Sequence, residues 1–313
     1  MSVVRKELEI AYKRVNPFIH RTPVLRSQAI DEMAECSVFF KCENFQKTGS
    51  FKMRGATNAI LNLSDEQRQK GVITHSSGNF AQAISLAAKI QGVKAYIIMP
   101  NNASEIKKDA VEDYGGIITL SDADINSREQ VTRTLQERTH ANFLHPSNQL
   151  DVILGQSTAT IEFMEQNPEL DFILTPVGGG GLIAGTALAA HHFSNNCKVI
   201  GGEPTQADDA YRSLKIGTIQ KNKEANTIAD GLRTHLGDVN FPIIKEHVLK
   251  IIRVDENEIV QAMKIIWNRL KIVIEPSSAV PFAALLKEKE NFKGDQVGII
   301  LSGGNVDLGQ LPF

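Results

Sequence analysis

Four consecutive glycines are the strongest chemical signal in the sequence. Gly178 to Gly181 follow the apolar run 172–177 and precede a second apolar run that begins at Leu182. Between a strand and a helix, such a turn exposes successive backbone N–H groups beside a helix N-terminus, an arrangement that binds anions. We therefore expect the turn to bind a phosphate group. It is not a nucleotide P-loop, because no lysine follows the glycines.

Two other interpretations of the glycine turn stay open at this point. Its spacing, Gly179-x-Gly181-x-x-Ala184, with Glu203 nineteen positions after Ala184, also fits a dinucleotide fingerprint. That interpretation predicts a nicotinamide-dependent dehydrogenase. A run of glycines can also serve only the packing of a tight turn.

A second segment places a lysine where a helix should begin. Residues 48–52 read Thr-Gly-Ser-Phe-Lys and lead into an amphipathic stretch. A cation at a helix N-terminus is electrostatically unfavourable. The position therefore suggests a chemical role for Lys52, such as a Schiff-base lysine with a lowered pKa, and an ordinary surface lysine is the alternative.

Two further loops carry small polar side chains at predicted strand ends. Residues 75–79 read His-Ser-Ser-Gly-Asn, and their hydroxyl and amide groups suit the capture of a carboxylate. Residues 302–305 read Ser-Gly-Gly-Asn and place one hydroxyl beside glycines. Either loop is explained equally well by an N-cap or a turn alone.

The elements that must position these loops alternate along the chain. Short β-branched runs predict strands at 38–41, 72–74, 95–99, 117–120, 172–177, 198–202, 250–254 and 297–301. Amphipathic stretches predict helices at 53–63, 81–90, 105–114, 127–137, 152–166, 182–193, 256–270 and 277–289. This alternation predicts an α/β fold of parallel sheets with helices on both faces. Ligands of such folds bind beyond the carboxyl ends of the strands, where all four loops fall.

Composition excludes several classes of protein. The 313 residues are 42% hydrophobic and 22% charged, the balance of an ordinary globular protein. The net charge is −2 and no long basic block occurs, which argues against a nucleic-acid partner. The longest apolar stretch, 177–190, is too short and too rich in glycine to span a bilayer.

The cysteines and the N-terminus point to a cytoplasmic protein. Three cysteines without a Cys-x-x-Cys spacing argue against a disulfide framework and against a thiolate zinc site. Residues 1–15 have the amphipathic pattern of a helix and not that of a secretion signal. We expect a cytoplasmic α/β enzyme.

Taken together and in this order, the motifs resemble the fold-type II family of pyridoxal-phosphate (PLP) enzymes, in its serine racemase and serine/threonine dehydratase branch. The likeness extends from the His-Arg-Thr-Pro at 20–23 to the Ser-Gly-Gly-Asn at 302–305, nearly the whole chain. It is greatest to serine racemases, in the segments 40–43, 46–52, 228–231 and 275–276.

The resemblance implies the architecture of the tryptophan synthase β chain, with two open, mostly parallel sheets flanked by helices. It also implies two domains. Residues 1–70 and 149–313 would form a large PLP-binding domain, and residues 71–148 a small domain inserted into it. A homodimer is usual in the family.

The resemblance also assigns the residues that contact the cofactor. Lys52 would be the Schiff-base lysine, and the other contacts would be Phe51 beside the ring, Asn79 at the ring hydroxyl, Gly178, Gly179, Gly180 and Gly181 at the phosphate, Gly231 along the cofactor and Ser302 at the pyridine nitrogen. A neutral Ser302 cannot stabilise a protonated ring as a carboxylate would. The weaker electron sink favours rapid loss of a β-leaving group.

The implied activity is that of a serine racemase or L-serine (threonine) ammonia-lyase acting on small β-hydroxy amino acids. The products would be the D-isomer, or a keto acid plus ammonia. Lys52 would remove the Cα proton, and Ser77 would be the second proton donor that racemisation needs. The alternative for Ser77 is a hydroxyl that only binds the carboxylate. The implied substrate contacts are Ser76, Ser77, Asn79, Arg128 and Thr234.

Two alternatives accompany this activity. The chain would instead be a 3-hydroxyaspartate or threonine dehydratase without racemase activity, or a catalytically silent member that only binds cofactor or amino acid. An intact Lys52 and Ser77 argue against the silent member.

A divalent-cation site is likewise implied by the resemblance. Glu203, the carbonyl of Ala207 and Asp209 match the family's cation ligands. Ligands that are all oxygen suit Mg²⁺, Ca²⁺ or Mn²⁺. An acidic surface turn is the alternative. A metal role for Glu203 removes it from the dinucleotide interpretation.

The sequence departs from the family's pattern at three places. Phe80 stands where histidine is usual, and the segment 145–148 has an extra residue, which bears on substrate choice. At the family's nucleotide-effector site, Lys47 and Gln82 match, but Leu120 replaces an aromatic residue. Activation by a nucleotide is therefore not expected from the sequence alone.

Overall fold

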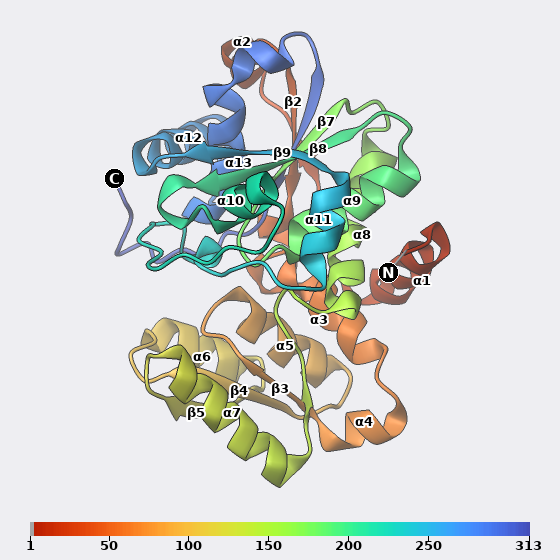
Figure 1. The fold of residues 1–313 in the computed structure, drawn as a ribbon, viewed down its shortest axis with the longest axis vertical. Helices are drawn as coiled ribbons and strands as arrows, with labels where there is room; N and C mark the ends of the chain where they lie inside the picture. Colours follow the sequence, from red (N-terminus) through yellow and green to blue (C-terminus); the bar gives the residue numbers. More distant parts are fainter. Residues whose placement is uncertain (1–2) are drawn as a thin grey trace.

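Two sheets, the larger in the upper half of Figure 1 and the smaller in the lower half, form the framework of the molecule. The computed structural model describes residues 3–313, except the side chain of Ile125. Both sheets are mostly parallel and are flanked by helices, so the α/β prediction is confirmed. None of the described helices is long and apolar enough to cross a membrane.

The larger sheet has the strand order β1-β2-β10-β7-β8-β9. Its strands are β1 (Val24–Leu25), β2 (Ser37–Cys42), β7 (Phe172–Pro176), β8 (Lys198–Pro204), β9 (Val248–Val254) and β10 (Gln296–Leu301). Strand β1 pairs antiparallel with β2, and the other neighbours are parallel. This short edge strand was not predicted, because two residues are too few to show a period-two pattern.

Helices cover both faces of the larger sheet. Adjacent strand residues alternate between two cores, as Ile173 and Leu174 show. One face packs against α1 (Arg5–Val15), α8 (Leu150–Gln166), α9 (Gly181–Phe193) and α11 (Asn240–His247). The other packs against α2 (Gln28–Ala34), α12 (Glu256–Leu270) and α13 (Pro276–Lys287). Burial on both faces explains why these strands have nearly continuous apolar sequences.

The smaller sheet has the order β5-β4-β3-β6 and is parallel throughout. Its strands are β3 (Val72–His75), β4 (Ala95–Pro100), β5 (Ile117–Ser121) and β6 (Asn142–Phe143). One face packs on α3 (Lys52–Leu61), α5 (Asn79–Ile90) and α6 (Glu105–Asp113), and the other on α7 (Ile125–Thr139). The domain division at 70/71 and 148/149 stays a proposal.

Each predicted strand and helix is present, with shifted ends. The prediction omitted α2, α4 (Asp65–Lys70), α10 (Asp209–Ile216), α11, β1 and β6. Helix α4 had a start signal, because Ser64 and Gln67 form a reciprocal capping box. These elements have eight residues or fewer, and the periodicity of so short a run is weak.

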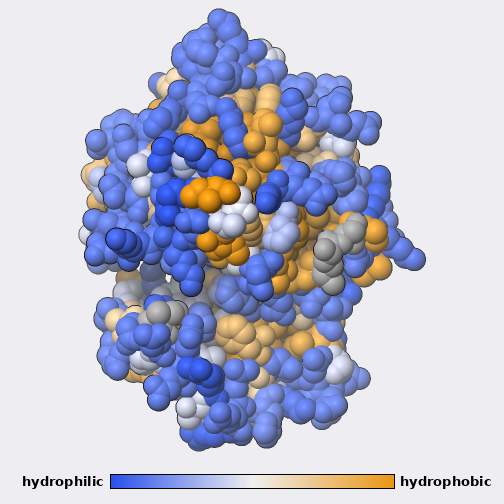
Figure 2. Space-filling view, viewed as in Figure 1, coloured by the Kyte–Doolittle hydropathy of each residue, from blue (hydrophilic) through white to orange (hydrophobic). Residues whose placement is uncertain are grey.

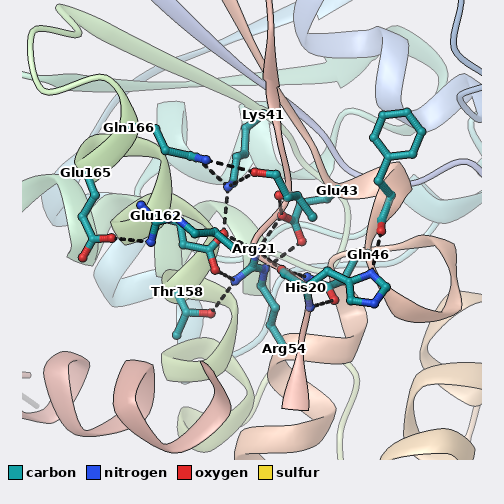
Figure 3. Close-up of polar contacts among 12 residues, drawn as sticks. His20, Arg21, Lys41, Glu43, Gln46, Arg54, Thr158, Glu162, Glu165 and Gln166 are labelled. Carbon is teal, nitrogen blue, oxygen red and sulfur yellow. Dashed lines mark hydrogen bonds and ion pairs between the residues drawn. The ribbon is translucent and has the colours of Figure 1, made fainter. Parts of the chain in front are cut away.

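Four buried charged side chains tie α3 to the larger sheet and to α8 (Figure 3). Arg54 contacts Glu43 at 2.7 Å and Glu162 at 2.9 Å, and Lys41 contacts Glu162 at 2.8 Å. All four side chains have 0% exposure. We call this set the buried ion network. Two positive and two negative groups balance, as buried charges must in a medium of low polarity.

Candidate active site

A cavity of about 1760 Å³ lies at the carboxyl ends of β3, β7 and β10. In Figure 2 the surface is hollowed between the upper and lower halves of the molecule. The cavity lining includes each residue predicted to contact cofactor or substrate: Phe51, Lys52, Ser76, Ser77, Asn79, Arg128, Gly178–Gly181, Gly231, Thr234 and Ser302. Segments far apart in the sequence therefore meet at one site.

Lys52 is the first residue of α3 and lies in an apolar part of the cavity. Its Nζ donates a hydrogen bond to the carbonyl of Pro146 at 2.9 Å. The same atom lies 5.0 Å from the ring centre of Phe51 and 5.7 Å from that of Phe80. Burial lowers the pKa of Lys52 to about 8, although Glu275 partly opposes the shift. About a tenth of the amine is therefore neutral at pH 7, and this neutral form can act as a nucleophile or base.

The glycine turn leads into α9, which begins at Gly181. Gly180 has a φ of +81°, which an L side chain rarely adopts, and a Cβ at Gly179 would come within 2.4 Å of the Ser147 hydroxyl oxygen. Among the described residues, none of the N–H groups from Gly178 to Gly181 has a hydrogen-bond acceptor. These open amides at a helix N-terminus suit a phosphate.

Asn79 is the first residue of α5, on the side of the cavity that the smaller sheet forms. Its Nδ2 donates to both carboxylate oxygens of Glu275 at 3.0 Å. Its Oδ1 accepts a hydrogen bond from Asn305 at 2.9 Å. The two contacts together fix the orientation of the Asn79 amide, since its donor and acceptor ends have different partners.

Ser302 follows β10 directly and is buried with 2% exposure. Its hydroxyl lies 3.0 Å from that of Ser278, and the Ser278 hydroxyl also donates to the carbonyl of Gly303. The backbone carbonyl of Ser302 accepts a hydrogen bond from the N–H of Phe51 at 3.0 Å. The loop that carries Ser302 is therefore bound to the residue next to Lys52.

The comparisons with known proteins identify the family. A family model described as "Pyridoxal-phosphate dependent enzyme" matches residues 15–303. The chain belongs to this family. It is 50% identical to the serine racemase of Dictyostelium discoideum, over 99% of this chain and 97% of that protein. It is 47% identical to the beta-hydroxyaspartate dehydratase of Paracoccus denitrificans, over 98% of each.

Solved structures of such PLP-dependent enzymes have the same fold. Maize serine racemase is similar with a TM-score of 0.96 and 46% identity, over 99% of this chain and 95% of that chain. The T.th. threonine deaminase is similar with a TM-score of 0.93 and 39% identity, over 98% of this chain and 99% of that chain. The predicted fold-type II architecture is confirmed.

The cavity fits the cofactor that the family name implies. The open amides of the glycine turn suit its phosphate, and the lowered pKa of Lys52 suits its aldehyde. The Ser302 hydroxyl has one hydrogen-bond partner within the described chain, the Ser278 hydroxyl, which is uncharged. The nicotinamide alternative finds no support here, since Glu203 is absent from the described cavity lining and its carboxylate accepts from the backbone of α10.

Three site residues were given no role by the sequence analysis. Glu275 is buried, and burial raises the pKa of its carboxyl to about 7. His75 and His145 line the cavity, and burial lowers the pKa of both. The sequence held one signal for Glu275: it precedes Pro276 at a helix start, a position where glutamate is a poor cap. In the structure its side chain does not cap α13.

The predicted cation ligands lie outside the cavity lining. Glu203 lies at the carboxyl end of β8, and its two oxygens accept from the N–H groups of Ala210 and Tyr211 at 2.9 and 2.8 Å. Asp209 accepts from Asn222 at 2.8 Å. Burial and the Asp209 carboxylate raise the pKa of Glu203. No group of three His, Cys, Asp or Glu side chains among residues 3–313 is arranged to hold a metal.

Proposed function

We propose that this PLP-dependent enzyme is a serine racemase and L-serine (threonine) ammonia-lyase. It acts on small β-hydroxy amino acids and gives the D-isomer, a keto acid plus ammonia, or both. The observation that carries the proposal is the Lys52 amine, whose pKa of about 8 makes it a base near neutral pH, in one cavity with the open glycine turn and Ser302. Relatives named serine racemase support the substrate class.

Separate residues of the chain would bind the substrate carboxylate and remove the Cα proton. When bound, PLP supplies an aldehyde that condenses with amines and a conjugated ring that delocalises negative charge from Cα. Residues 76–79, at the start of α5, would hold the substrate carboxylate with hydroxyl and backbone donors. Lys52 would take the proton from Cα through the neutral form of its amine, which the lowered pKa of about 8 makes more abundant near pH 7 than in an ordinary lysine.

Ser77 is proposed as the proton carrier on the other face of the substrate. It lines the cavity, and its hydroxyl makes no hydrogen bond to any described residue, whereas the neighbouring Ser76 hydroxyl accepts one from the N–H of Gly78 at 3.4 Å. A free hydroxyl can both accept and donate a proton. We expect Ser77→Ala to abolish D-serine formation while pyruvate formation persists.

The decisive experiment uses the purified enzyme loaded with PLP. Incubation with L-serine, while pyruvate and D-serine are followed together, should reveal one or both products, and Lys52→Ala should lose at least about a thousandfold in rate. Borohydride treatment followed by mass spectrometry should place a covalent modification on Lys52. An unmodified Lys52 would contradict the proposal.

A dicarboxylate substrate is the second candidate. Arg128 lines the cavity, and its Nε is buried without a hydrogen-bond partner among the described residues. A guanidinium in this state suits a second carboxylate, such as that of 3-hydroxyaspartate. A relative named beta-hydroxyaspartate dehydratase agrees with this. A panel of L-serine, L-threonine and 3-hydroxyaspartate ranks the candidates.

We also propose that Glu203, the Ala207 carbonyl and Asp209 hold a divalent cation such as Mg²⁺. All three donors are oxygens, and the two carboxylates are buried at 0% and 1% exposure, where a cation would offset their charge. Mg²⁺ should raise the melting temperature of the native enzyme, and Asp209→Asn should remove that rise. A homodimer and a cytoplasmic location stay predictions.

A further inference from the structure

The fold fixes the tautomer of the cavity-lining His145. Its Nδ1 accepts hydrogen bonds from the backbone N–H groups of Ser147 at 3.2 Å and Asn148 at 2.8 Å. A ring nitrogen that accepts two N–H bonds carries no proton, so the proton is on Nε2. Burial, with smaller contributions from His75 and Lys52, also lowers the pKa of His145 to about 4. The ring is therefore neutral near pH 7.

The Nε2–H group of His145 is left without a partner. It makes no hydrogen bond within the described part of the chain, and it is not among the buried polar atoms there that lack one. Since His145 lines the cavity, this donor is open to whatever occupies the cavity. The ring also contacts Phe143 edge-on, with centroids 6.2 Å apart, which restricts its rotation.

His145 adjoins the base of the proposed reaction. The carbonyl of Pro146, the next residue, accepts the hydrogen bond from Lys52 Nζ at 2.9 Å. A substrate whose Cα faces Lys52 would have its β-substituent within reach of this wall of the cavity.

We propose that the Nε2–H of His145 donates a hydrogen bond to the side-chain oxygen of the substrate and thereby selects β-hydroxy amino acids. The inference rests on the proposed function and names a specificity-determining contact of that same site. The contact orients the substrate and transfers no proton, because a neutral imidazole N–H is a very weak acid. A bound substrate shields this donor from water, so a substrate without a side-chain oxygen would leave it unpaired and is disfavoured.

His145→Asn tests the proposal. The asparagine Oδ1 can take the place of Nδ1 and accept the same two backbone N–H groups, while the donor at the Nε2 position disappears. The readout is kcat/KM for pyruvate formation from L-serine and from β-chloro-L-alanine, whose chloride leaving group needs no hydrogen-bond donor. We expect a loss of about 10- to 100-fold on L-serine and less than about threefold on β-chloro-L-alanine.

His140→Asn is the matched control. His140 is absent from the described cavity lining and has a φ of +55°, which asparagine tolerates well. This variant should leave both kcat/KM values unchanged. His145→Phe is the second test variant, in case His145→Asn does not fold. It keeps a ring but has neither nitrogen, and it too should lower the ratio of serine to chloroalanine activity.

The outcomes test this inference and the proposed function separately. Equal losses on both substrates would mean that His145 only supports the fold of its loop, and would overturn this inference alone. A wild-type enzyme loaded with PLP that turns over neither substrate would overturn the proposed function and this inference together.

Discussion

The amide of Asn79 and the carboxylate of Glu275 form a partly buried contact at 3.0 Å across the cavity, although 196 positions separate them. Asn79 follows the smaller sheet's β3, and Glu275 precedes α13 on the larger sheet. Asn79 is the only side chain to which the Glu275 carboxylate is hydrogen-bonded within residues 3–313. The contact therefore joins the two halves of the site through one titratable group, the carboxyl of Glu275.

Stability should depend on pH through Glu275. Burial raises the pKa of its carboxyl from 4.5 to about 7 in the folded chain. The stabilisation that comes from protonated Glu275 is therefore fully present below the unfolded pKa of 4.5. It is lost as the pH rises through the folded pKa of about 7. Relative to Glu275→Gln, the wild-type free energy of unfolding without cofactor should fall by on the order of 3 kcal/mol between about pH 4.5 and pH 7.5.

Urea unfolding of both proteins at the two ends of this range measures the difference. Glu32→Gln, at an exposed position on α2, is the control for a general effect of removing a carboxylate. A difference between wild type and Glu275→Gln that does not change with pH would contradict the prediction.

The apolar surroundings of Lys52 should set its pKa. Phe80 is buried at 2% exposure, and its ring lies 5.7 Å from the Lys52 amine. Phe80→Ser should admit water and raise the pKa of Lys52 from about 8, since burial is the main cause of the shift. The pH dependence of labelling of Lys52 by an amine-specific reagent, read by mass spectrometry, checks this.

Phe80→Leu is the matched control, because leucine keeps the site apolar. Its labelling midpoint should stay near that of the wild type. A midpoint that rises equally in both variants would show that the ring itself, and not the exclusion of water, determines the pKa.

Removing one member of the buried ion network should destabilise the fold strongly. Arg54 is fully buried between Glu43 and Glu162, so Arg54→Met leaves Glu43 without a cationic partner and Glu162 with Lys41 alone. We expect a loss of about 3–5 kcal/mol in the free energy of unfolding. Lys70→Met removes an exposed pair with Glu66 and should cost about 0.5 kcal/mol or less. Similar shifts in the urea midpoint for the two variants would contradict this account.

Arg128 should distinguish dicarboxylate from monocarboxylate substrates. If it pairs with a second carboxylate, Arg128→Met should lower kcat/KM for 3-hydroxyaspartate about 10- to 100-fold more than for L-serine. Arg133→Met is the control, because Arg133 is on the same helix and lines the same cavity but is exposed. A parallel loss on both substrates in Arg128→Met would assign Arg128 to a contact that they share.

The sequence predicted those parts of the site that local patterns encode. The glycine turn, the lysine at a helix start and the polar loops after strands are each readable within a few residues. In an α/β fold the carboxyl ends of parallel strands meet at one edge, so these motifs could be expected to share a site. The short elements α10, α11, β1 and β6 were missed because they give too few residues for a periodicity.

Only the tertiary structure determined the protonation and orientation of the groups in the cavity. The raised pKa of Glu275 and the pairing of Arg54 depend on burial and on partners distant in sequence, and the tautomer of His145 depends on how its own loop folds back onto the ring. Desolvation and hydrogen bonding act through space, and no pattern of neighbouring residues records them. The sequence by itself therefore determined which chemistry is available, and the packing of two sheets determined the charge and direction of each group.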